Sequence, residues 1–300
     1  MKKGFSKQQG CAIIKLYAHR KERILVLHHI SDYLLVSDLD GTLLQDPYTV
    51  NPRSEQAIRR LLSKGGRFTI ATGRVYGAAK EILKQIPVNA PVITANGGCI
   101  LETETGEVLQ DLYLPEKAKS YIKEINSRFP QLDLDFFPEG AECVYVFRGK
   151  NDWENVFIGA GLSFSYAVAQ DWQRRWRKCI FECPIEQKAD LDEYLAEYSA
   201  SFEGVCFVNS SLQFYEMIPS QVSKGSALKQ LAGLLNIPRE RIAAVGDFDN
   251  DLSMVRFAGI GAFTADAAPN LKKEANLVVC SNSEGAVADV VEYLEKLCGE

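Results

Sequence analysis

The sequence predicts an α/β protein with a doubly wound parallel-sheet core and an inserted α+β domain. Two observations lead to this prediction. Near both ends of the chain, apolar runs of strand length alternate with runs of helical length, and the intervening stretch lacks this alternation. The expected division is a core of residues 31–96 and 213–300, an insertion of residues 97–212, and an N-terminal extension of residues 1–30.

The first core segment is bounded by clear start and stop signals. Asn51 and Pro52 are typical of a helix start, because Asn caps free N–H groups and Pro fits the first helical turn. Gly65 is typical of a helix end, and Pro87 ends a second helix. The alternation implies right-handed crossovers between parallel strands. The expected strands are 33–37, 68–71 and 92–95, and the second helix is expected at 76–85.

The insertion is expected to be antiparallel, and the chain then resumes the core pattern. A turn at 103–106 separates two short apolar runs, which is typical of a hairpin. In the insertion we expect strands at 99–102, 108–111, 132–137, 143–147 and 205–208, with helices at 115–128 and 187–198. In the second core segment we expect strands at 242–245, 259–263 and 277–279, with helices beginning at Lys224, Asp251 and Ala286.

Composition narrows the possible partners and the location. The formal net charge of −5 does not indicate a nucleic-acid or anionic-membrane surface. No apolar run reaches the roughly 18 residues that a membrane helix needs. The eight cysteines contain no C-x-x-C pair, so we interpret them as reduced core residues of a cytoplasmic protein. Residues 1–30 carry seven Lys or Arg and one Glu, which makes this extension basic.

Two acidic residues follow the first expected strand directly. Asp38 and Asp40 stand two residues apart, with Gly41 next, where ligands bind in open α/β sheets. One carboxylate could attack an electrophile while the other moves a proton, and both could face one hard cation. The alternative interpretation is a pair of solvated carboxylates in a turn.

Three later segments also place polar residues at strand ends or helix starts. Thr72, Gly73 and Arg74 follow the strand at 68–71, where a hydroxyl and turn amides could hold a phosphate oxygen. Lys224 opens a helix, so its charge and the helix N-terminus could face an anion. The last segment runs from Gly246 to Asp251 and contains Asp247, Asp249, Asn250 and Asp251.

These four segments resemble the motifs of the haloacid dehalogenase (HAD) superfamily of phosphohydrolases, and most closely its Cof-type, subclass IIB branch. The matching strings are D-L-D-G-T-L at Asp38, A-T-G-R at Ala71, S-K-G-S-A-L at Ser223 and G-D-F-D-N-D at Gly246. Asn96-Gly97-Gly98 is similar to a further family motif, N-G-A. The resemblance covers roughly residues 33–298.

The resemblance implies a mechanism and a metal. Asp38 is implied to be the nucleophile and Asp40 the acid and base. A Mg²⁺ ion would be held by Asp38, the backbone carbonyl of Asp40 and Asp247, with Asp251 contributing directly or indirectly. The implied phosphate-binding groups are Lys224, Thr72, the amides of Leu39 and Gly73, and the side chain of Asn250.

For two features, Arg74 and the run from Trp172 to Lys178, the sequence leaves two interpretations open. Arg74 could contact substrate, or it could tie the core to the mobile cap that the resemblance implies for residues 97–212. The basic and aromatic run from Trp172 to Lys178 could contact substrate or phosphate, or it could be a solvated helix face with one buried Trp.

The sequence therefore predicts a Mg²⁺-dependent phosphatase of small phosphorylated metabolites, acting as a monomer or small homo-oligomer. A phosphomutase would use the same residues but pass the phosphate to a second hydroxyl. A non-catalytic homologue and a receiver-type signalling domain are further alternatives, although the latter lacks the second Asp and the insertion. The sequence does not identify the substrate.

Overall fold

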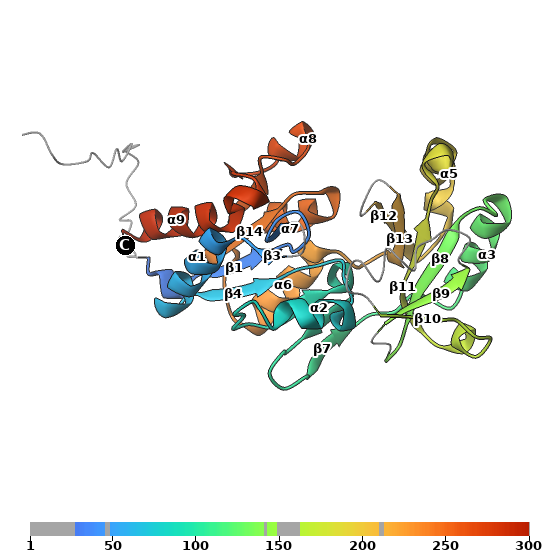
Figure 1. Ribbon diagram of the computed structural model, residues 1–300, viewed down its shortest axis with the longest axis horizontal. Helices are drawn as coiled ribbons and strands as arrows, with labels where there is room; N and C mark the ends of the chain where they lie inside the picture. Colours follow the sequence, from blue (N-terminus) through green and yellow to red (C-terminus); the bar gives the residue numbers. More distant parts are fainter. Residues whose placement is uncertain (1–27, 46–48, 141–142, 149–162, 210–212, 300) are drawn as a thin grey trace, which may run out of the picture.

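The computed structural model describes residues 28–45, 49–140, 143–148, 163–209 and 213–299, and it consists of two lobes, each built on its own sheet (Figure 1). The core lobe contains a five-stranded parallel sheet in the order β16-β15-β14-β1-β4. The predicted α/β core is confirmed. Its strands are β1 (Leu34–Ser37), β4 (Arg67–Ile70), β14 (Ile242–Gly246), β15 (Ile260–Thr264) and β16 (Leu277–Val279).

Helices cover both faces of this sheet because its strands are apolar on both sides. Leu35 and Val245 pack against α1, α2 and α9, whereas Val36 and Ala244 pack against α6 and α7. The predicted cap of α1 is confirmed, since the Asn51 side chain accepts a hydrogen bond from the Arg53 amide. The core helices are α1 (Pro52–Ser63), α2 (Tyr76–Leu83), α6 (Lys224–Leu234), α7 (Leu252–Phe257), α8 (Pro269–Lys272) and α9 (Ala286–Cys298).

The strand expected at 92–95 lies largely outside the parallel sheet. One parallel bridge, between Ala71 and Ile93, joins it to the core, and its other pairing is antiparallel within the sheet β5-β6-β7. The strands of that sheet are β5 (Val92–Thr94), β6 (Cys99–Leu101) and β7 (Val108–Asp111). A short antiparallel pair that the sequence analysis did not predict, β2 (Leu44–Gln45) and β3 (Thr49–Val50), follows the first acidic loop.

The second lobe, here called the cap, has a six-stranded sheet in the order β10-β9-β8-β11-β13-β12. Helices α3 (Ala118–Arg128) and α5 (Lys188–Tyr198) pack on one face, and the other face lies toward the core. Because β13 belongs to this sheet, we propose that the cap continues past residue 212 to Pro219. The strands are β8 (Asp133–Pro138), β9 (Val144–Arg148), β10 (Phe164–Tyr166), β11 (Trp176–Glu182), β12 (Val205–Asn209) and β13 (Phe214–Pro219).

The run from Trp172 to Lys178 is not a helix face. A short 3-10 turn at Asp171–Gln173 leads into β11, so the helical interpretation is wrong. Trp176 is buried, and its ring stacks on Phe136 with a centroid distance of 4.2 Å. Strand pairing with β8 and β13 decides this conformation, because β propensity depends strongly on neighbouring strands.

Two predictions from composition can be compared with the described residues. Within these ranges no disulfide joins any of the cysteines, and the sequence neighbours Cys179 and Cys183 are both buried. Every helix in the same ranges is too short or too polar to cross a membrane. The basic residues of the expected N-terminal extension lie outside the described residues.

Candidate active site

Three carboxylates converge at the carboxyl edge of the parallel sheet. Asp38 follows β1 and Asp247 follows β14, and these strands are neighbours with Ser37 opposite Val245. Asp251 ends the 3-10 turn that precedes α7. One oxygen from each carboxylate lies within 4.8 Å of the others. The parallel topology therefore unites two predicted segments that are about 200 residues apart.

Lys224 connects two of these acids. It is the first residue of α6, whose N-cap, Ser223, accepts a hydrogen bond from the amide of Ser226. Its Nζ lies 2.6 Å from Asp38 Oδ1 and 2.6 Å from Asp251 Oδ1. The Lys224 side chain is 1% exposed, so both ion pairs are shielded from water. The predicted cation therefore lies at the carboxylate cluster.

The site has more negative than positive charge. Burial raises the pKa of Asp38, Lys224 opposes that shift, and the neighbouring carboxylates reinforce it. Burial and Asp251 raise the pKa of Asp247 to about 6. Although burial disfavours its charged form, the two bound carboxylates raise the pKa of Lys224. One ammonium group cannot balance three carboxylates, two of them buried and the third partly buried, so the site favours an additional cation.

The donor atoms fit a magnesium ion. Carboxylate oxygens are the ligands that hard divalent cations prefer. Thr42 Oγ1 donates to Asp247 Oδ1 over 2.7 Å and orients that carboxylate. Gly41 has φ +81°, and a Cβ there would come within 2.4 Å of Asp247 Oδ2. Only glycine therefore leaves room beside this predicted ligand.

Asp251 has a different arrangement from the other two acids. Its Oδ2 accepts hydrogen bonds from the amides of Asp247 and Phe248, at 3.0 and 3.1 Å. Its Oδ1 accepts from Lys224. With both oxygens engaged, Asp251 holds the loop and the lysine in place, which favours the indirect contribution to metal binding over a direct one.

The phosphate-binding segment predicted after β4 lies at the same edge. The parallel register places Ile70 opposite Ser37, so Thr72 and Gly73 follow at the level of the acidic loop. Thr72 is buried, and its Oγ1 accepts a hydrogen bond from the amide of Arg74 over 3.1 Å. The hydroxyl proton of Thr72 can therefore be donated to a phosphate oxygen.

Arg74 contacts the second acid of the first motif. Its guanidinium donates two hydrogen bonds to the Asp40 carboxylate, at 2.9 and 2.7 Å. The Asp40 side chain is 45% exposed and stays apart from the buried carboxylate cluster. Both residues of this ion pair belong to the core, and Arg74 orients Asp40, the residue predicted to act as acid and then as base.

Leu39 and Asn250 were predicted to contact phosphate, and the structure shows what holds each of them. The carbonyl of Leu39 accepts hydrogen bonds from the amides of Leu43 and Leu44, at 3.1 and 2.8 Å, and so fixes the turn that follows Asp38. Asn250 donates a 3.0 Å hydrogen bond to the side chain of Asn96. Asn96 was not among the predicted site residues, and the Asn-Gly pair at a strand end was the signal that could have identified it.

A cavity of about 320 Å³ lies beside these residues, between the core and the cap. Its core wall includes Lys224, Asn250 and Asn96, and its cap wall includes Val208 and Ile218. It therefore offers space for a small organic group next to the lysine.

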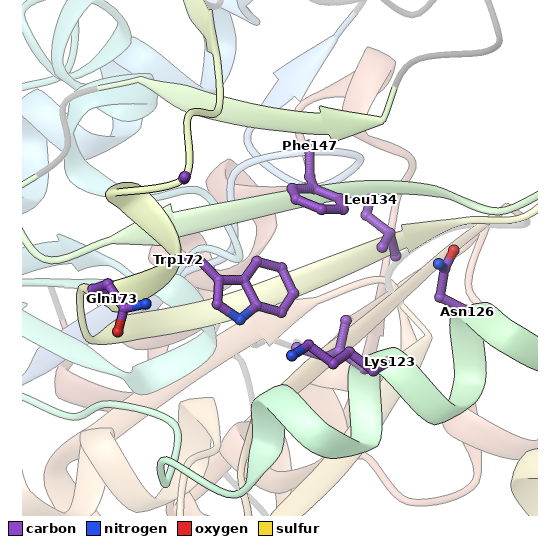
Figure 2. Close-up of a pocket in the computed structure, with 8 residues that line it drawn as sticks. Lys123, Asn126, Leu134, Phe147, Trp172 and Gln173 are labelled. Carbon is purple, nitrogen blue, oxygen red and sulfur yellow. The ribbon is translucent and has the colours of Figure 1, made fainter.

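A separate cavity of about 540 Å³ opens on the opposite face of the cap sheet. Lys123 and Asn126 of α3 face Trp172 and Phe147 across it (Figure 2). Leu134 lines it, whereas the adjacent Asp135 of the same strand points to the core side, because successive strand residues alternate. This part of the predicted basic and aromatic run therefore faces away from the carboxylate cluster.

Comparison with known proteins decides the family. A family model described as haloacid dehalogenase-like hydrolase matches residues 35–291. The chain belongs to the haloacid dehalogenase-like hydrolases. The resemblance stated from the four motifs is thereby confirmed.

Two relatives from Bacillus subtilis illustrate the range of the family. Phosphatase YwpJ is 28% identical over 87% of this chain and 99% of its own length. The 5-amino-6-(5-phospho-D-ribitylamino)uracil phosphatase YitU is 25% identical over 85% of this chain and 95% of its own. With the family assignment, these relatives make this HAD hydrolase a phosphoric monoester hydrolase.

Solved structures share the fold over nearly their whole length. A haloacid dehalogenase-like hydrolase from B. subtilis aligns with a TM-score of 0.76 and 26% identity, over 87% of this chain and 99% of that one. A HAD subclass IIB sugar phosphatase aligns with a TM-score of 0.75 over 87% of this chain and 98% of that one. Its 18% identity makes this a likeness of fold alone.

Replacing Arg74 with Met is expected to lower kcat for p-nitrophenyl phosphate about tenfold, because Asp40 would lose the group that orients it. The matched control is Arg67→Met, at the opposite end of β4, which should keep the wild-type kcat. Steady-state kinetics of both variants, after thermal melting confirms folding, would make the comparison. An unchanged kcat in Arg74→Met would show that the ion pair does not support turnover.

Proposed function

We propose that this HAD hydrolase is a Mg²⁺-dependent phosphatase that hydrolyses phosphate monoesters of small metabolites through an aspartyl phosphate on Asp38. The observation that carries the proposal is the buried pairing of Asp38 with Lys224 beside Asp247. It supplies a nucleophile, a fixed cation and an oxygen site for a metal at one sheet edge.

In the first step, Asp38 attacks phosphorus and the bond from phosphorus to the ester oxygen breaks. Lys224 already binds Oδ1 of Asp38, so we assign the attack to Oδ2. Asp40 donates a proton to the departing oxygen, which leaves as an alcohol. Lys224 and the Thr72 hydroxyl then stabilise the negative charge on the phosphoryl oxygens.

In the second step, Asp40 accepts a proton from a water molecule that attacks the phosphorus of the aspartyl phosphate. The bond between phosphorus and the Asp38 oxygen breaks, which releases inorganic phosphate, restores the Asp38 carboxylate and leaves Asp40 protonated for the next cycle. Mg²⁺, held by Asp38, the carbonyl of Asp40 and Asp247, would neutralise phosphate charge when bound. The amides of Leu39 and Gly73 and the side chain of Asn250 complete the proposed phosphate contacts.

The proposed substrates are small because the cavity beside Lys224 is small. Its volume of about 320 Å³ suits a sugar-sized or nucleoside-sized leaving group. Its wall from β12 and β13 contributes apolar side chains, and Asn250 offers a polar contact. Substrate selection would therefore depend on the cap as well as on the core.

Phosphate release from a panel of esters tests this function. The panel should include hexose and pentose phosphates, flavin mononucleotide, pyridoxal phosphate and 5-amino-6-(5-phospho-D-ribitylamino)uracil, each with Mg²⁺ and with EDTA. We expect release from at least one ester with Mg²⁺ and none with EDTA. Transfer of phosphate to a second hydroxyl without release would favour a phosphomutase, and no turnover of any ester would contradict the proposal.

A further inference from the structure

A buried ion pair lies on the face of the cap sheet that is turned toward the core. Lys178 of β11 and Glu216 of β13 are joined by a 2.7 Å contact between Nζ and Oε2. Their side chains are 3% and 5% exposed. Such a pair is costly to bury unless further hydrogen bonds satisfy its remaining donors and acceptors. The partners that satisfy it therefore indicate what the pair does.

Those partners belong to the core. Lys178 Nζ donates a 2.8 Å hydrogen bond to the carbonyl of Gly73, in the predicted phosphate-binding loop. Glu216 Oε2 accepts a 2.8 Å hydrogen bond from the side-chain amide of Asn96. Each charged residue of the cap thus holds one loop at the edge of the core sheet.

Asn96 is also hydrogen-bonded to two of the motif segments. Its amide donates to the carbonyl of Thr72 over 3.0 Å, and its side-chain oxygen accepts from Asn250 over 3.0 Å. Asn96 and the preceding Ala95 have φ values of 55° and 52°, which non-glycine residues rarely adopt. A turn with two such residues needs outside contacts to hold it, and Glu216 supplies one of them.

An open cap would break these contacts. Lys178 and Glu216 could stay paired, but the Gly73 carbonyl and the Asn96 amide would each lose a charge-assisted hydrogen bond. Both bonds are strengthened because each involves a charged side chain that is almost completely buried. Closure of the cap and the geometry of the two loops are therefore coupled, and each favours the other.

We propose that Lys178 and Glu216 are positioning residues, through which the closed cap fixes Gly73 and Asn96 in the geometry that receives the phosphoryl group. They act through Thr72, Gly73 and Asn250 and need not touch the substrate. The link to turnover rests on the proposed phosphatase function, whereas the link to loop geometry does not. Two measurements separate these parts.

Hydrogen exchange tests the link to loop geometry without any substrate. Lys178→Met should speed amide exchange at least about threefold in peptides covering residues 72–98, and leave α9 unchanged. The matched control is Arg177→Met. Arg177 precedes Lys178 on the same strand and is paired with Asp111, at 2.7 Å, instead of the loop. Equal exchange of residues 72–98 in both variants and the wild type would overturn the proposal.

Kinetics with p-nitrophenyl phosphate test the link to turnover. Glu216→Leu should lower kcat at least about tenfold with a smaller change in KM, because the loops would be misplaced for the transition state. Glu216→Gln keeps an oxygen that can accept from Asn96, so it should recover part of the loss. Equal kcat values in Glu216→Leu and wild type, or equal losses in both variants, would contradict the positioning role.

The core side provides a second route if a cap variant does not fold. Asn96→Ala breaks the contact with Glu216 and also the contact with Asn250, so its kcat loss should be at least that of Glu216→Leu. The double variant should lose little more than Asn96→Ala alone, because the contact with Glu216 is then already broken. Fully additive losses would overturn the proposal. If the wild-type protein hydrolyses neither p-nitrophenyl phosphate nor any ester of the panel, the phosphatase proposal fails, and the exchange measurement alone decides the coupling.

Discussion

Asp38→Asn is expected to lower kcat for p-nitrophenyl phosphate by at least about 10³-fold, which is about 4 kcal/mol of activation free energy. Asn is a poor nucleophile, although it has nearly the same shape and can still accept a hydrogen bond from Lys224. The fold should therefore persist, and the loss should appear in kcat. Steady-state kinetics with Mg²⁺, together with thermal melting, would measure both effects.

The matched control for this variant is Asp266→Asn. Asp266 is exposed in the loop after β15, at the same edge of the sheet, and it lies outside the carboxylate cluster. It should keep wild-type turnover. Near-normal turnover in Asp38→Asn would refute the assignment of Asp38 as the nucleophile, whereas equal losses in both variants would point to a general effect of lost charge.

Asp247→Ala is expected to raise the Mg²⁺ concentration for half-maximal activity at least about tenfold. The change removes one of the carboxylates with which the core would hold the metal. In the wild type, EDTA should abolish turnover. Ca²⁺ should compete with Mg²⁺ for the site and lower turnover, because it takes more ligands than Mg²⁺ and would disturb the geometry of the reaction. Titration of activity with Mg²⁺ would measure the shift.

Binding can be followed without turnover as well. Mg²⁺ should raise the melting temperature of the wild type by mass action, and this rise should be much smaller in Asp247→Ala. Asp266→Ala, which removes an exposed acid, should respond as the wild type does. Full activity in metal-free buffer, or an equal Mg²⁺ response in Asp247→Ala, would contradict the proposed metal site.

The positions of the carboxylates could be predicted because local patterns determine them. Apolar runs mark where β1 and β14 end, and alternation with helices implies that these strands are parallel. Asp38 and Asp247 must then emerge at one edge of the sheet. The Lys224 prediction also depended on a local signal, the start of a helix after Ser223.

Other contacts could not be predicted because no local pattern encodes them. The pairing of Arg74 with Asp40 was not predicted, and the two interpretations of Arg74, substrate contact or a tie to the cap, stay predictions. One of the two interpretations of the run from Trp172 to Lys178 was a solvated helix face, and the structure has a strand there instead. Only pairing of β11 with β8 and β13 shows that Trp176 is buried and that Lys178 points to the core.

By itself, the sequence determined the parallel core, the acids at its strand ends and the presence of an insertion, since each follows from residue spacing within one segment. Tertiary structure decided how the insertion meets the core. Lys178 and Glu216 are 105 and 120 positions from the core residues they bind. Such contacts depend on the strand order of the cap and on the position of one lobe against the other, and neither is expressed in local periodicity.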